Sequence, residues 1–333
     1  MNGTIEFKNK PRLTTVYTVV GPKEKNSVLG LNYDLRLNDD KFGESTYEKA
    51  ECKMLTTAVK RVIKRACLKE EDIGAILSGD LLNQIISSSF MARDFKIPFL
   101  GLYSACSTIT ESLIIGSTLL DSGYLNNVVC AAGSHFSTAE RQYRYPLELG
   151  AIRPPQSQWT VTGAGAYVLS NNVKGYPAIT CATIGKVVDY GVTDANNMGA
   201  AMAPACCSTL IRHFNATNTT PKDYDLIVTG DLGALGSRLL KSLAKDSGYD
   251  LSKNHVDCGE LIYNMDEQSY QGGSGAGCGT VVMASYIYPK LKRKEINRVL
   301  FLATGALLST VSAGQGESIP GISHAIVLEN IYD

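Results

Sequence analysis

Residues 68–84 read LKEEDIGAILSGDLLNQ, and residues 219–235 read TTPKDYDLIVTGDLGAL. Each stretch has an acidic turn, a short β-rich strand and then Gly-Asp-Leu. Each also follows an amphipathic segment, residues 47–66 in the first case and 202–214 in the second. The recurrence of this local pattern in the second half indicates that one folding unit occurs twice in the chain.

Three more pairs of segments occur in the same order in the two halves. They are residues 126–134 with 297–305, 162–171 with 321–330 and, more loosely, 18–30 with 182–194. Each half then reads strand, helix, strand, helix, strand, helix, strand, strand. Strands that alternate with helices predict parallel crossovers and a sheet covered on both faces. We therefore expect an α/β protein whose halves, residues 1–174 and 175–333, pack as one integrated unit.

The third helix expected in each half spans residues 107–122 and 274–288 and is rich in Gly, Ala, Ser and Thr. Small side chains let two helix backbones approach each other closely. We therefore expect these two helices to lie together at the centre of the molecule.

The composition is that of an ordinary globular protein, with 44% of the 333 residues hydrophobic and 19% charged. Lys plus Arg and Asp plus Glu both number 32, so no bulk charge favours nucleic acid as a partner. Residues 1–25 contain no apolar signal segment, and no apolar run reaches the roughly 18 residues of a membrane span. These patterns predict a protein that is soluble or peripheral to a membrane.

Nine cysteines, an odd number, are scattered along the chain, and no C-x-x-C motif occurs. This pattern argues against a zinc site, a redox pair and a disulfide framework. Cys106 differs from the others because it lies between an apolar strand, residues 97–103, and the helix expected over 107–122. A helix N-terminus stabilises a thiolate. Cys106 is therefore either a nucleophile or a small buried thiol.

The order of elements resembles the thiolase superfamily, and Cys106 matches the position of its nucleophilic cysteine. That resemblance implies a duplicated βαβαβαββ unit in five layers, α-β-α-β-α. A closer resemblance, over nearly the whole chain, is to the stage V sporulation protein AD family of spore-forming Firmicutes. The stretches that carry it include YSACSTITES (103–112), STAERQYRYPLE (137–148), IGKVVDYGVTDANNMGAAMAPA (184–205), TGDLGALGS (229–237) and GGSGAGC (272–278).

The family resemblance implies a thiolase homologue without catalytic activity, cofactor or metal that binds pyridine-2,6-dicarboxylic acid (dipicolinic acid), free or as its calcium chelate. It implies that the protein forms a complex with other stage V sporulation A-operon membrane proteins. This complex moves dipicolinate into the forming spore and out of it at germination. The expected location is the forespore or spore, peripheral at the inner membrane. The superfamily also implies a homodimer, paired through the edge strand of the first half, which we expect at residues 126–134 or its neighbour.

The alternative function is that of an active thiolase- or ketoacyl-synthase-like acyltransferase that uses Cys106. Superfamily enzymes take a His from the loop that matches 226–235 and a second His or Asn near 269–277. The first stretch has no His, Asn or Gln, and the second has Gly and Ser at that place. Condensing chemistry needs a base and oxyanion donors, so we predict that Cys106 lines a pocket without catalysing a reaction. A simply buried thiol is an equal alternative.

The four histidines differ in their expected surroundings. His135 follows a first-half strand and His324 begins the last strand, so either could face the pocket. His213 is expected to be exposed on an amphipathic helix, and His255 to lie in a polar turn.

A planar dianion needs donors at both carboxylates and an apolar slot for its ring. The Gly- and Ser-rich helix starts around Cys106 and Gly273 offer backbone N–H groups. Arg141 and Arg144 lie among tyrosines and offer bidentate carboxylate contacts, although this stretch could equally be a surface or subunit-interface loop. Lys186 could face the pocket or pair with Asp189. The expected ligand-binding residues are Cys106, His135, Arg141, Arg144, Lys186, Gly273 and His324.

Asp80 and Asp231 follow matching strands in the two repeats. The simplest expectation is that each caps the helix that follows it. A calcium-binding role is the less favoured alternative.

Overall fold

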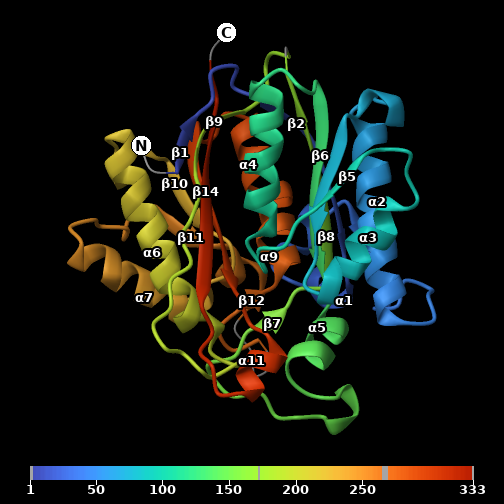
Figure 1. Cartoon of the computed structure of the whole chain (residues 1–333), viewed down its shortest axis with the longest axis vertical. Coiled ribbons are helices and arrows are strands. Elements are labelled where there is room, and N and C mark those ends of the chain that lie inside the picture. The colour runs from blue at the N-terminus through green and yellow to red at the C-terminus, as the bar shows by residue number, and fades with distance from the viewer. Residues whose placement is uncertain (1–2, 172, 265–268, 332–333) are drawn as a thin grey trace.

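A computed structural model of the chain describes residues 3–171, 173–264 and 269–331. Ten of its strands divide into two groups of five, and helices lie between the groups and on both outer faces (Figure 1). The result is the five-layer α-β-α-β-α arrangement that the resemblance to the thiolase superfamily implies.

The two groups of strands have the same internal order. The first runs β5-β4-β6-β8-β2 and the second runs β11-β10-β13-β14-β9. In the first, β4 is parallel to both β5 and β6, whereas β8 is antiparallel to β6 and β2. In the second, β10 is parallel to β11 and β13, whereas β14 is antiparallel to β13 and β9. The Gly-Asp-Leu stretches therefore follow β4 and β10, which are equivalent strands.

The strands of the first group are β2 (Arg12–Val20), β4 (Ala75–Gly79), β5 (Phe99–Gly101), β6 (Asn127–Ser134) and β8 (Gly163–Ser170). Those of the second are β9 (Ala178–Thr183), β10 (Leu226–Thr229), β11 (His255–Asp257), β13 (Arg298–Ala306) and β14 (Gly321–Glu329). The short strands are β1 (Thr4–Glu6), β3 (Leu35–Arg36), β7 (Trp159–Thr160) and β12 (Gly273–Ser274), of which β7 and β12 pair with each other. The two groups join where Arg12 of β2 pairs with Ala178 of β9.

The outer layers consist of α2 (Tyr47–Arg65) and α3 (Ile86–Ala92) over the first group, and α6 (Met198–Thr217) and α7 (Gly233–Asp246) on the side of the second. The middle layer holds α4 (Thr108–Asp121) and α9 (Ala276–Val282), and a π-helical turn at Met283–Ile287 leads from α9 into α10 (Tyr288–Lys292). The remaining helices are α1 (Pro22–Lys25), α5 (Phe136–Tyr143), α8 (Cys258–Ile262) and α11 (Thr310–Gly314).

Each central helix packs against both halves of the chain. Helix α4 contacts β4 and β6 of its own half and β13 and β14 of the other, while α9 contacts β6 and β8. Strands β4 and β10 are covered on both faces, so they read as apolar runs rather than as alternating patterns. The prediction that residues 107–122 and 274–288 meet at the centre is confirmed.

The predicted dimer edge is misplaced. Residues 127–134 form β6, which lies inside the sheet between β4 and β8, and both of these neighbouring strands are internal as well. The free edge of the first group is β5, where the Leu100 side chain is 43% exposed. The sequence pattern hid this edge because β5 is short and its apolar residues resemble those of a buried strand.

Candidate functional site

A small cavity lies where the two central helices begin. Its lining residues come from both halves of the chain: Leu81, Tyr103, Ala105, Cys106, Ala139, Tyr143, Arg144 and Thr160 from the first, and Met198, Met202, Ser274, Gly275, Ala306 and Leu308 from the second. The free volume is about 40 Å³, which is room for about three water molecules.

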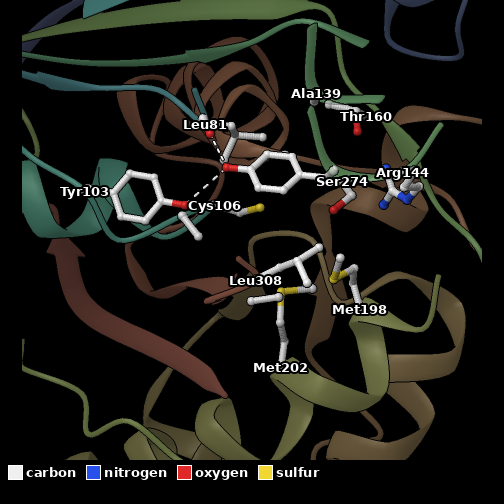
Figure 2. A pocket seen from close by; sticks show the side chains of 14 residues that line it. Leu81, Tyr103, Cys106, Ala139, Arg144, Thr160, Met198, Met202, Ser274 and Leu308 are labelled. Atoms are coloured by element: carbon white, nitrogen blue, oxygen red, sulfur yellow. Dashed lines mark hydrogen bonds between the residues drawn. The ribbon is translucent and has the colours of Figure 1, made fainter. Parts of the chain in front are cut away.

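Cys106 occupies a tight turn between β5 and α4. Ala105, directly before it, has a φ of 47°, a left-handed conformation that non-glycine residues seldom adopt. Ser104 donates its backbone N–H to Thr108 Oγ1 at 3.1 Å, which holds the turn closed. Backbone outliers of this kind cluster at functional sites, and this one directs the sulfur into the cavity (Figure 2).

Asp231 is the ionisable neighbour of Cys106. The Asp231 carboxyl is buried and hydrogen-bonds with the Cys106 thiol. It also accepts hydrogen bonds from Thr304 Oγ1 at 2.7 Å, Ser274 Oγ at 2.9 Å and the Gly275 N–H at 3.0 Å. Burial, and then the adjacent Asp231, raise the pKa of the Cys106 thiol well above its usual range, and the smaller effects of Gly275 and Ser274 do not offset this. Cys106 is therefore a protonated thiol at neutral pH.

The expectation that Asp80 and Asp231 each cap the helix that follows is confirmed for Asp80 and wrong for Asp231. Asp80 accepts from the N–H groups of Leu82 at 2.9 Å and Ser88 at 2.7 Å, so it does fix the chain that enters α3. Asp231 instead reaches across to Ser274, Gly275 and Thr304. The signal that could have revealed this is its location in the loop from which superfamily enzymes take a His.

Arg144 is the one charged residue among those that line the cavity. Its side chain is 6% exposed, and a guanidinium nitrogen lies 3.2 Å from Glu140, which also pairs with Arg153 at 2.9 Å. The Arg144 Nε has no hydrogen-bond partner. Burial lowers the pKa of Arg144 and the nearby Glu140 raises it, yet a guanidinium remains charged in proteins. Arg144 therefore supplies a cation with donor capacity beside the cavity.

The rest of the lining is aromatic and aliphatic. Tyr103 and Tyr143 lie with their hydroxyls 3.3 Å apart, and Tyr143 in turn donates to the Leu81 carbonyl. Met198 and Leu308 lie across the cavity from Tyr103, and Arg144 lies near Ser274 (Figure 2). Sequence reasoning missed both tyrosines and the methionines as lining residues. Tyr103 falls in YSACSTITES, Tyr143 in STAERQYRYPLE, and Met198 and Met202 in the segment 184–205.

Arg141 does not reach the cavity. It pairs with Glu48 of α2 at a partly exposed position. Lys186 is exposed, and the Asp189 carboxylate accepts from the Gly191 N–H and from Ser318. Gly273 is buried in β12 and its carbonyl accepts from Gln158, so the next two residues line the cavity in its place.

His135 and His324 both lie behind the lining rather than in it. His135 Nδ1 accepts from the Ser137 N–H at 3.1 Å, which caps α5, and Nε2 bonds the Asp40 carbonyl at 2.8 Å. His324 Nδ1 accepts from the Gly185 N–H at 3.0 Å, and Nε2 lies 3.1 Å from Ser104 Oγ. Burial lowers the pKa of His324 to about 4, so a neutral ring supports the turn before Cys106.

His213 and His255 were both placed wrongly. His213 is buried between Thr183 at 2.8 Å and Tyr224 at 2.9 Å, not exposed. His255 lies in β11 rather than in a turn, and its Nε2 is 2.9 Å from Thr229 Oγ1. Burial lowers the pKa of His213 to about 4 and that of His255 to about 3, so both act as neutral hydrogen-bonding residues.

Comparison with solved structures supports the fold alone. A 3-oxoacyl-[acyl-carrier-protein] synthase III from Aquifex aeolicus VF5 is 13% identical, with a TM-score of 0.58 over 96% of this chain and 99% of its own. An OleA structure from Xanthomonas campestris is 13% identical, with a TM-score of 0.62 over 97% of this chain and 98% of its own. The architecture is thus that of the thiolase-like condensing enzymes.

Across the described ranges, no helix combines the length and the apolar character needed to cross a bilayer.

Comparison at the level of sequence is more specific. The family model for stage V sporulation protein AD matches residues 1–329. Stage V sporulation protein AD of Bacillus subtilis (strain 168) is 44% identical over 323 residues, which cover 97% of this chain and 95% of that protein. This chain therefore belongs to the stage V sporulation protein AD family.

Proposed function

We propose that this protein is the dipicolinate-binding component of the spore membrane complex that takes up dipicolinate in sporulation and releases it in germination. In this proposal it is a thiolase homologue that binds a ligand without transforming it. Membership of a sporulation family supports the biological setting, and the cavity beside Cys106 supports a small-molecule site.

The observation that carries the proposal is the buried Arg144 at the side of an otherwise apolar and aromatic cavity. A buried carboxylate requires a compensating charge, because its desolvation without a partner costs several kcal/mol. Arg144 can meet one carboxylate through donors that Glu140 does not use. Tyr103 and Tyr143 offer aromatic surface for a flat ring, and Leu308 offers aliphatic surface.

The cavity must open for this ligand. A volume of about 40 Å³ holds a few water molecules but not a pyridine ring with two carboxylates. Entry therefore requires lining side chains to move. Tyr143 and Arg144 are suited to such movement because both lie at the end of α5. The backbone of Arg144 is not helical, with a φ of −131°.

The surroundings of Cys106 support the absence of catalysis. No histidine lines the cavity among the described residues, and His324, which contacts the turn before Cys106, bonds Ser104 rather than the thiol. A condensing enzyme needs a reactive thiolate and a positioned proton acceptor. The alternative function, an acyltransferase that uses Cys106, requires both. Acetyl or malonyl thioesters should leave no acyl adduct on Cys106 by mass spectrometry, and an elongated adduct would establish the alternative.

Calorimetric titration with dipicolinate, with and without calcium, tests the binding proposal. Arg144→Gln removes the charge beside the cavity, and we expect about tenfold to a hundredfold weaker binding from the loss of a charged hydrogen bond. Arg141→Gln is the matched control because Arg141 lies in the same short segment but outside the cavity. Unchanged affinity in Arg144→Gln would place the site elsewhere, and no binding by the natural protein would refute the proposal.

The location follows from the same proposal. We infer that the protein lies at the inner membrane of the forespore, held there by other membrane proteins of the stage V sporulation A operon. Fractionation of forespores should recover it with membranes, and deletion of those partner proteins should release it. If the protein stays on membranes without these partner proteins, it binds the membrane directly, and this part of the proposal is wrong.

A further inference from the structure

Asp231 has a role at this site that the loss of catalytic partners alone does not explain. It comes from the loop after β10, yet three donors to its carboxylate lie elsewhere: Ser274 Oγ in β12, the Gly275 N–H just before α9, and Thr304 Oγ1 in β13. Two of these, Ser274 and Gly275, also line the cavity with Cys106. The carboxylate therefore lies behind the cavity wall, where it contacts both the thiol and the donor groups around it.

We propose that Asp231 fixes the chemical state of Cys106, by accepting the thiol hydrogen and by engaging the Ser274 and Gly275 donors that would otherwise stabilise a sulfur anion or an oxyanion. Asp231 is a positioning residue that acts through Cys106. The inference concerns the protein without ligand, so it holds whether or not dipicolinate is the compound that enters the cavity.

The distribution of donors decides which of the two acids is ionised. Two adjoining buried acids cannot both carry a negative charge without strong repulsion. Asp231 has three donors besides the thiol, whereas Cys106 has the weaker contacts to Gly275 and Ser274. Burial raises the pKa of the Asp231 carboxyl, and its hydrogen bonds oppose that rise, whereas both burial and Asp231 raise the pKa of the Cys106 thiol. The charge of the pair therefore resides on the carboxylate and the proton on the sulfur. No covalent step is involved, and the thiol neither gains nor loses atoms.

The commitment of these donors also limits where an anion can bind. Gly275 N–H donates to Asp231 at 3.0 Å and Gly277 N–H donates to Ser134 Oγ at 3.0 Å. Neither group is available to a ligand carboxylate, contrary to the expectation that the Gly- and Ser-rich stretch would supply donors. A bound anion is consequently directed away from Cys106 and toward Arg144.

The pH dependence of Cys106 alkylation tests the inference. The measured quantity is the rate of iodoacetamide modification of the Cys106 peptide, by mass spectrometry, between pH 6 and 10. In Asp231→Asn the neighbouring negative charge is gone, so the thiol pKa should fall by about one pH unit or more, and labelling at pH 8 should be about tenfold faster than in the natural protein. Asp80→Asn, at the equivalent strand end but bonded to Leu82 and Ser88, is the matched control and should leave the profile unchanged.

A second measurement does not use Asp231→Asn, so it does not depend on whether that variant folds. In the infrared S–H stretching region, the natural protein minus Cys106→Ala should show one band at lower frequency than a free thiol, as expected for S–H donation to a carboxylate. Absence of that band, or an alkylation profile in folded Asp231→Asn that matches the natural protein, would overturn the inference. Neither result bears on dipicolinate affinity, so this inference and the proposed function can fail separately.

Discussion

Arg144 pairs with Glu140 of the preceding helical turn at 3.2 Å, and both side chains are about nine-tenths buried. The same Glu140 oxygen lies 2.9 Å from Arg153. One carboxylate thus pairs with two guanidinium groups, of which Arg144 lines the cavity.

The first prediction concerns this buried pairing. Glu140→Gln leaves two buried cations without their carboxylate, and removal of one partner from a buried pair costs about 3–5 kcal/mol. We expect a fall of that order in the free energy of unfolding, measured by urea denaturation. Glu48→Gln, which breaks the partly exposed pair with Arg141, should cost less than about 1 kcal/mol. Equal losses in the two variants would show that burial does not govern these pairs.

The second prediction is a pH dependence of stability from Glu24. Burial raises the pKa of Glu24 to about 7, against the smaller opposing effect of its hydrogen bond with Tyr263. Between about pH 4.5 and 7 the folded chain keeps this proton and the unfolded chain loses it, so the contribution of Glu24 to stability falls as the pH rises through that window. The total is about 3 kcal/mol, most of it between pH 5 and 7.

Glu24→Gln isolates this effect, because Gln remains neutral and can still accept from the Thr162 N–H, a bond of 3.0 Å in the natural protein. Urea denaturation at pH 5, 6, 7 and 8 should show the natural protein losing stability relative to Glu24→Gln as the pH rises. A constant difference across these pH values would mean that the pKa of Glu24 is not raised in the folded protein.

The third prediction is a homodimer that pairs through β5. This edge exposes Leu100, and Phe90 of the neighbouring α3 is also 44% exposed, so the free edge is an aggregation risk unless it is covered. Sedimentation at micromolar concentration should give a dimer, and Leu100→Glu should give a monomer. Val311→Glu, an exposed apolar site on α11, is the control. A monomeric natural protein would contradict the prediction and leave the edge to another protein of the spore.

The fourth prediction is that residues 1–174 and 175–333 superpose as halves related by a pseudo-twofold axis but do not fold separately. Helix α4 packs on β13 and β14, and α9 packs on β6 and β8, so each fragment alone would expose a helix face that the other buries. Residues 1–174 expressed alone should lack dispersed NMR signals, and co-expression with residues 175–333 should restore them. A folded isolated fragment would show that the halves are independent domains.

The duplicated fold could be predicted from the sequence because strand and helix periods are local properties. The paired segments around Gly79 and Gly230 fall at equivalent strand ends, and Cys106 lies between a strand and a central helix as expected. These features depend on the order of short patterns along the chain. The strands could be recognised in the sequence because a strand that is buried on both faces requires a continuous apolar run.

The site residues depended on contacts between distant segments, which local patterns do not encode. Arg141 and Arg144 are alike in sequence, but the helix ends at Tyr143 and only the second arginine turns into the cavity. His213 has an amphipathic setting in sequence, yet Thr183 and Tyr224 enclose it. Asp231 acquires its role from residues 106, 274, 275 and 304. The sequence alone determined the layers and the position of the thiol. The tertiary structure decided which charges reach that thiol, because the free energy of a buried charge depends on the donors that folding brings around it.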